Sequence, residues 1–269
     1  MNVSVRALSA LSVGAALFLA AGCGGSSPTP MPAQPALGAR SGHTAFATHP
    51  ATGTITAPIY LASARTYAVM AGSTVTNTGN TVINGDLGLS PGTAVTGFPP
   101  GIINGHTHVA DAPALKAQTD LTKAYNDAAG RPGGTALPAD IGGMVLAPGV
   151  YTAPVSLGIT GTVTLDAQNN PKSIFIFQIP STLITAVGSS VKMINGALAC
   201  NVYWQVGSSA TLNTSSDFRG TIMAYSSISV GAGSNIHGRL LARTAAVTLI
   251  DDTINRTPYC ECKIGGPTV

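Results

Sequence analysis

Two nine-residue stretches near the carboxyl end of the chain repeat each other at an interval of 18 residues. Ser216–Ala224 and Ser234–Ala242 share an apolar residue, a Gly two positions later, a second apolar residue and a closing Ala. A short period of β-forming segments and small residues is typical of a chain wound into coils, which bury their apolar sides by stacking. The repeat therefore predicts a mostly β fold, a parallel β-solenoid, whose long faces are where a function would lie.

The same pattern occurs far upstream, because Ile83–Leu87 repeats the arrangement of Ile236–Leu240. From about residue 67, apolar residues alternate with Thr or Asn, and Gly marks the corners, as in half-buried strands. Further along, Ile174–Ile179 and Val202–Val206 are almost continuously apolar. Such strands are expected where parallel strands are covered on both sides.

One helix is expected between these regions, at about residues 112–129. Asp111 can cap its first turn, Pro113 suits that turn, and Gly130 can close its carboxyl end. Apolar residues recur at helical spacing and predict a narrow stripe lying along the flank of the solenoid. The residues of this stripe are Leu115, Leu121, Tyr125 and Ala128.

The beginning of the chain is typical of an export signal. Arg6 is the only charge before an uncharged stretch that ends in Ala-Ala-Gly, directly before Cys23. A Cys in this position resembles a bacterial lipobox, in which it becomes the lipidated first residue; ordinary cleavage with an incidental Cys is the alternative. The expected parts are a lipoprotein-type signal peptide at 1–22, an Ala/Pro/Gly/Thr-rich tether at 23–60, a solenoid domain at 61–258 and a tail at 259–269.

The predicted location follows from this signal. Acyl chains on Cys23 would hold the protein on a membrane without spanning it. Gly24 follows in place of Asp, which by analogy with lipoprotein sorting favours the outer membrane or cell surface. Without lipidation the protein would be secreted. No later stretch is apolar for long enough to suggest a transmembrane helix.

Three cysteines remain after Cys23. Export makes a disulfide possible, and a bridge from Cys200 to Cys260 would pin the tail to the last coils, with Cys262 as the alternative partner. Cys260 and Cys262 could also form half of a metal site, but a second pair of ligands is missing. No metal is therefore expected.

The composition excludes several classes of function. Only 9% of the residues are charged, against about 25% in a typical globular protein. The basic residues are scattered, whereas nucleic-acid binding needs a basic stripe. The glycine-rich runs form no phosphate-binding motif, so no cofactor is expected.

Catalysis is also disfavoured. Glycoside hydrolysis needs two carboxylates flanking a cleft, but the acids fall mostly at predicted caps and turns. Asp251-Asp252 is the only adjacent pair and lies in a predicted turn near the end. His106 and His108 could share one face of a strand, but no Cys or acid at ligand spacing accompanies them.

Several ordered motifs resemble the ice-binding-like family of bacterial and fungal antifreeze proteins. The resemblance runs from about Leu61 to Ile254 and rests on Ala71–Gly79, Gly85–Gly92, Ala124–Arg131, Phe175–Ile179 and Val202–Gly207. It implies a discontinuous right-handed β-solenoid of triangular section, with one long helix packed alongside and the first coil next to the last ones. The activity it implies is adsorption to ice through one flat face.

A face that binds ice must be rigid and weakly charged. Thr suits this demand because its hydroxyl anchors a water, its methyl excludes others, and its β-branch stiffens the side chain. Some family members carry a Thr-(Ala or Gly)-any-(Thr or Asn) motif, which Thr78–Thr81 matches. Thr93–Thr96 also matches, but no apolar-x-Gly corner follows it, so it ranks lower.

The ice-contact candidates are this motif, its neighbours and the equivalent places in later coils. They are Thr74, Thr76, Thr78, Asn80, Thr81, Ser189, Ser190, Thr214, Ser216, Ala232, Ser234 and Asn235. The prediction is an exported, lipid-anchored, monomeric ice-binding protein that inhibits ice growth or recrystallisation and is not an enzyme. The alternatives are a surface adhesin or envelope protein that binds glycan or protein, and, third, a polysaccharide-active enzyme.

Overall fold

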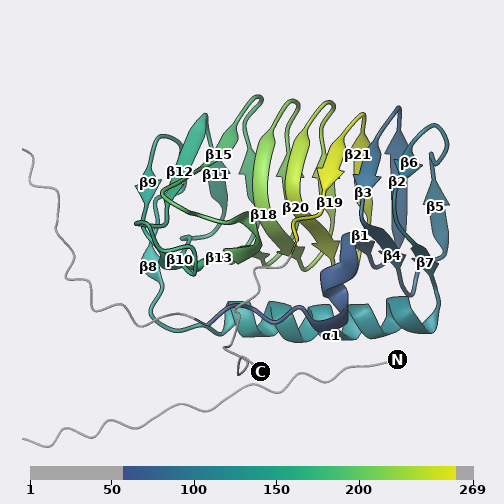
Figure 1. Ribbon diagram of the computed structural model, residues 1–269, viewed down its shortest axis with the longest axis horizontal. Helices are drawn as coiled ribbons and strands as arrows, with labels where there is room; N and C mark the ends of the chain where they lie inside the picture. Colours follow the sequence, from purple (N-terminus) through teal and green to yellow (C-terminus); the bar gives the residue numbers. More distant parts are fainter. Residues whose placement is uncertain (1–56, 259–269) are drawn as a thin grey trace, which may run out of the picture. The chain divides into compact units, whose positions relative to one another are not determined.

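A computed structural model describes residues 57–258. Within them, parallel strands stack into coils with three faces, and one helix packs alongside (Figure 1). The fold is therefore the mostly β, parallel solenoid that the repeat predicts. In this part of the chain, no helix is both long and apolar enough to cross a membrane.

The first face, called the seven-stranded face, is a separate parallel sheet. Its strands, from one end of the stack to the other, are β11 (Leu157–Ile159), β14 (Leu183–Thr185), β17 (Ala210–Leu212), β19 (Ile228–Val230), β21 (Val247–Ile250), β2 (Thr74–Thr78) and β5 (Ala94–Thr96).

The second, helix-covered face packs against α1 (Ala112–Ala129). Its strands are β8 (Thr135–Ala136), β10 (Gly149–Thr152), β13 (Phe175–Ile179), β16 (Val202–Val206), the second halves of β18 (Asp217–Ala224) and β20 (Asn235–Ala242), β1 (Tyr67–Ala71), β4 (Asp86–Leu89) and β7 (Thr107–Val109). Two short 3-10 helices, η1 (Ala62–Thr66) and η2 (Ala199–Asn201), lead into β1 and β16.

The third face completes the coils. Its strands are β9 (Val145–Leu146), β12 (Thr162–Asp166), β15 (Ser190–Ile194), the first halves of β18 and β20, β22 (Thr253–Asn255), β3 (Val82–Asn84) and β6 (Ile102–Ile103). Because β18 and β20 continue around a corner, the second and third faces form one 15-stranded sheet.

The repeat seen in the sequence is the register of two neighbouring coils. β18 pairs in parallel with β20 along its whole length, from Asp217 opposite Asn235 to Ala224 opposite Ala242. At the corner Gly238 lies opposite Gly220, and a Cβ atom on Gly238 would clash with the Gly220 carbonyl group. The shared Gly of the repeat thus allows two coils to approach each other closely.

The first coil is inserted beside the last coils. β1 lies between β20 and β4, β2 lies between β21 and β5, and β22 pairs with β3. Figure 1 shows these blue strands next to the yellow ones. This neighbour relation is the one that the family resemblance implies.

Helix α1 carries the chain back along the stack, from β7 at one end to β8 at the other (Figure 1). Its 18 residues span about 27 Å at about 1.5 Å per residue, which corresponds to between five and six coil spacings of about 4.8 Å. As the sequence predicts, the Asp111 carboxylate caps its start by accepting a hydrogen bond from the Ala114 N–H at 2.9 Å, and Gly130 is its C-cap.

The buried side of α1 differs from the predicted stripe in one residue. Leu115 is 60% exposed, whereas Leu121, Tyr125 and Ala128 are buried. Small residues supply the rest of the contact, namely Ala114, Ala117 and Ala124. The helix approaches the sheet through these Ala side chains, so the bulkier Leu115 points to solvent.

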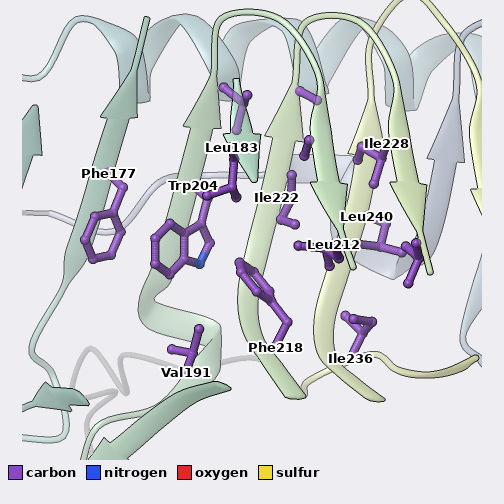
Figure 2. Packing of buried hydrophobic residues seen from close by; sticks show 14 of the residues in the cluster. Phe177, Leu183, Val191, Trp204, Leu212, Phe218, Ile222, Ile228, Ile236 and Leu240 are labelled. Carbon is purple, nitrogen blue, oxygen red and sulfur yellow. The ribbon is translucent and has the colours of Figure 1, made fainter. Parts of the chain in front are cut away.

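The interior of the solenoid is filled by side chains stacked from coil to coil (Figure 2). Tyr151, Phe177 and Trp204 occupy equivalent positions in β10, β13 and β16. The Phe177 and Trp204 rings stack with centroids 3.9 Å apart, and Phe218 follows at 5.2 Å from Trp204. The Trp204 indole N–H donates to the Arg219 carbonyl at 3.1 Å, so this buried polar group is satisfied.

Candidate functional site

The helix-covered face is not available to a large partner. The Gln118 side chain donates from α1 to the Ala71 and Ala242 carbonyls at 2.8 and 3.2 Å. A second apolar cluster, including Leu121, Met223 and Leu241, fills the space between the helix and this face. Only the other two faces present strand residues to solvent over a long surface.

The seven-stranded face carries no charged residue in any of its strands. Its central outward row can be followed from the register, one residue per coil. The row, all exposed or half-exposed, is Thr96, Thr76, Thr248, Ser229, Thr211, Ile184 and Gly158. Five consecutive coils thus hold a hydroxyl group at the same position, spaced by about 4.7–4.9 Å along the stack.

Hydroxyl groups beside the central row bond across the coils. Ser227 Oγ donates to Ser209 Oγ at 2.9 Å, and Thr182 Oγ1 donates to Ser156 Oγ at 2.8 Å. Each pair joins residues just before neighbouring strands of this face. Such bonds restrict the rotation of these side chains in the folded protein. Less rotamer entropy is therefore lost when the face binds a surface.

The predicted residues of β2 lie on this face. Thr76 and Thr78 are exposed, and Thr74 is half-exposed, while Val75 and Asn77 between them point inward and are buried. The alternation that the sequence shows therefore places these three Thr residues together, as the half-buried strand pattern predicts.

Sequence reasoning missed four members of the central row: Thr96, Thr211, Ser229 and Thr248. The signal that could have found the last three is an apolar–hydroxyl–apolar triplet: Ala210-Thr211-Leu212, Ile228-Ser229-Val230 and Val247-Thr248-Leu249. The four-residue motif selects residues at the corner after each strand, whereas the central row lies within the strands. Thr96 ends the second match to the motif, which ranks lower because no corner follows it.

Four candidates are buried and cannot touch a surface outside the protein. Thr81, Ser189, Ser216 and Ser234 are only 0–2% exposed. The backbone turns at Gly79, whose φ is 81°, so the last Thr of the motif points into the corner. These four positions are corrected from surface contacts to interior corner residues.

The buried corner residues hydrogen-bond from coil to coil. The Ser234 hydroxyl accepts from the Ser216 N–H at 3.2 Å, and the Thr81 hydroxyl accepts from the Asp252 N–H at 3.0 Å. Hydroxyl groups of Thr185 and Ser216 lie 2.9 Å apart. Their role is to satisfy backbone groups where the chain turns.

Asp252 belongs to this corner and is a buried acid at 1% exposure. Its two carboxylate oxygens accept from the Ser234 N–H at 3.0 Å and the Ile250 N–H at 2.8 Å. Burial nevertheless raises the pKa of Asp252 to about 6, because the charged form loses its contact with water. Its place, fully bonded inside the corner, gives it a structural role.

The remaining candidates lie elsewhere. Asn80, Thr214 and Ala232 occupy the turns between the seven-stranded face and the third face, while Ser190 and Asn235 lie on the third face itself. The structure therefore does not bring the twelve candidates onto one surface. The third face also carries the ion pair between Asp217 and Arg219, at 3.0 Å.

His108, one of the two His residues rejected above as metal ligands, has a structural partner. His108 Nδ1 lies 2.7 Å from the helix-capping carboxylate of Asp111. Among residues 57–258, no group of three or more His, Cys, Asp or Glu is placed to hold a metal ion. Cys200 lies in η2, but Cys23, Cys260 and Cys262 fall outside the described residues, so lipidation and the disulfide stay predictions.

Stacked parallel coils, an inserted first coil and a helix along one flank define a discontinuous β-solenoid. The family described as ice-binding-like matches residues 69–255, and the chain belongs to this family.

Individual relatives agree with this assignment. An ice-binding protein of Nostoc sp. (strain HG1) is 45% identical over 203 residues, which cover 75% of each chain. A solved ice-binding protein from an Antarctic biological consortium is 50% identical, with a TM-score of 0.75 over 77% of this chain and 94% of that one. The ice-binding protein of Antarctomyces psychrotrophicus is 37% identical, with a TM-score of 0.73 over 75% of this chain and all of that one.

Proposed function

We propose that this protein binds ice through the seven-stranded face. The observation that carries the proposal is the row of five hydroxyl side chains in consecutive coils, with no charged residue in the strands of that face. The names of the relatives, all ice-binding proteins, support the same function.

The chemistry of the row suits a surface made of ordered water. Each hydroxyl can hold one water, and the parallel register repeats that water at about the spacing of the coils, 4.7–4.9 Å. Long charged side chains would lose rotamer entropy on contact and retain their own hydration. The apolar core behind the strands keeps this array rigid, so binding to ice costs little further conformational entropy of the side chains.

A bulky substitution in the middle of the row tests the proposal. Thr76→Tyr in the mature chain should remove most of the ice-recrystallisation inhibition, because the ring holds the neighbouring coils away from the crystal. Thr164→Tyr, on β12 of the third face, is the matched control and should keep the activity. Circular dichroism checks that both variants are folded; equal activity of the two variants would place ice binding on another surface.

The proposal includes export and attachment to a membrane through lipidated Cys23, at the outer membrane or cell surface. The uncharged stretch before Ala-Ala-Gly-Cys supports it. Mass spectrometry of the mature amino terminus checks it: an acylated Cys23 is expected, and Cys23→Ala should release the protein into the medium. An unmodified Cys23 at the mature terminus would instead indicate a secreted protein.

A further inference from the structure

The third face carries a row of basic side chains in consecutive coils. Arg219 of β18 lies opposite His237 of β20. Ser190 of β15 pairs with Asp217 of β18, so Lys192, two residues further along β15, lies in the coil before Arg219. Arg219 and His237 are therefore one coil spacing apart, about 4.7–4.9 Å, and all three residues lie on a face that the helix does not cover.

The sheet opens at this point. β15 pairs with β12 at five positions but with β18 only through Ser190 and Asp217, so β15 and β18 separate beyond that pair. Between them lies a hollow of about 360 Å³. Its lining is mostly polar and consists of Thr162, Ser190, Val191, Lys192, Met193, Asp217 and Arg219.

Hydrogen-bonding capacity in the hollow is only partly used. Arg219 Nη2 bonds Asp217 Oδ2 at 3.0 Å, while the buried Asp217 Oδ1 accepts no hydrogen bond. Lys192 is exposed and makes no ion pair with any residue in the described range 57–258. The hydroxyl groups of Thr162 and Ser190 lie 2.9 Å apart at the rim. Among the lining residues, one acid thus faces two cations.

We propose that this hollow and the basic row bind an acidic polysaccharide, one whose sugar residues carry carboxylate groups. A carboxylate between Lys192 and Arg219 would complete their pairing by charge-assisted hydrogen bonds. Sugar hydroxyl groups would meet the hydroxyl pair of Thr162 and Ser190 at the rim. Cations, an acid and hydroxyls in one polar hollow match a ligand that is both charged and rich in hydroxyls.

The rest of the face extends the same surface. Beyond His237, three amide side chains bond in a ladder: Asn104 donates to Asn84 at 2.9 Å, and Asn84 donates to Asn255 at 2.7 Å. The coil spacing is close to the length of one sugar residue in an extended chain. Successive sugars could therefore meet successive coils, with carboxylates at the basic row and hydroxyls at the amides.

The test is affinity electrophoresis of the mature chain in gels that contain polygalacturonate, at low ionic strength. The wild type should be retarded, and neutral galactan should cause no retardation. Lys192→Gln, and Lys192→Gln with Arg219→Gln, should weaken binding by about tenfold or more, since charge-assisted hydrogen bonds are lost. Lys172→Gln is the matched control, because Lys172 is exposed and outside the hollow, and it should bind like the wild type.

The result is independent of ice binding. The double variant should retain ice-recrystallisation inhibition, and Thr76→Tyr should retain polygalacturonate binding, so failure of one function is distinguishable from failure of the other. The proposal is overturned if the wild type is not retarded, if neutral galactan or polyphosphate retards it equally, or if Lys172→Gln weakens binding as much as Lys192→Gln.

Discussion

The seven-stranded face and the third face are made by the same coils, yet they present different chemistry. Both have parallel strands in register and the same spacing along the stack. One carries Thr and Ser in a central row and no charge, whereas the other carries Lys192, Arg219, Asp217 and His237. The comparison teaches that the fold sets the spacing of a surface, while the outward residues of each strand decide what it can bind.

The largest expected effect comes from disturbing the spacing itself, which would break both faces together. Gly238→Ala places a Cβ against the Gly220 carbonyl group and must push β18 and β20 apart. We expect a loss of about 3 kcal/mol or more in the free energy of unfolding, measured by denaturant titration. Gly149→Ala is the control, because its Cβ would meet only the Tyr151 ring at 3.9 Å; similar losses in both would contradict the role of the corner Gly.

A smaller effect is expected at the corner between the two faces. The pKa of Asp252 is raised to about 6 from 3.8, so the folded state holds this proton more tightly than the unfolded state. This group therefore adds stability below about pH 4, and that stability is lost as the pH rises toward 6, by about 2–3 kcal/mol in total.

Asp252→Asn isolates this contribution. The variant cannot titrate, and its amide would turn an N–H toward the Ser234 or Ile250 N–H, so it should be less stable than the wild type at pH 7. Thermal melts from pH 3.5 to 7.5 measure the difference between the two proteins. That difference should be largest at low pH; a difference independent of pH would show that the Asp252 pKa is not raised.

The smallest expected effect comes from a substitution at Ile184, where the hydroxyl row ends. Ile184 interrupts the row after Thr211 and is 47% exposed. Ile184→Thr should extend the row by one coil and raise ice-recrystallisation inhibition modestly, at a cost of about 1 kcal/mol or less in stability because the side chain is only half-buried. Ile184→Val keeps the β-branch without the hydroxyl and should not raise the activity; an equal gain in both would make shape, not the hydroxyl, the cause.

The fold was largely predictable, because stacking forces a repeat on the sequence. The interval between Ser216–Ala224 and Ser234–Ala242 is the register of β18 and β20, and the capping chemistry of Asp111 marks the start of α1. The exposure of Leu115 was not predictable from helical spacing, because both Leu and Ala residues recur at that spacing. Which of them faces the sheet depends on how closely the helix approaches it.

The site was predictable only in part. Strand alternation placed Thr74, Thr76 and Thr78 correctly on one face. It fails beyond Gly79, where a positive φ reverses which side the following residues point to, and Thr81 becomes buried. Which separate strands share a face depends on long-range pairing, so the alignment of Thr76 with Thr248 could not be read from local sequence.

The inserted first coil has a consequence for how this molecule forms. Thr76 and Thr248 are neighbours in the hydroxyl row although they stand near opposite ends of the domain's sequence. A chain still emerging during synthesis or translocation can stack its middle coils. It cannot pair β2 with β21 until the final strands have emerged. Such distant pairing slows folding, and the continuous row of hydroxyl groups comes into existence only with the last step of assembly.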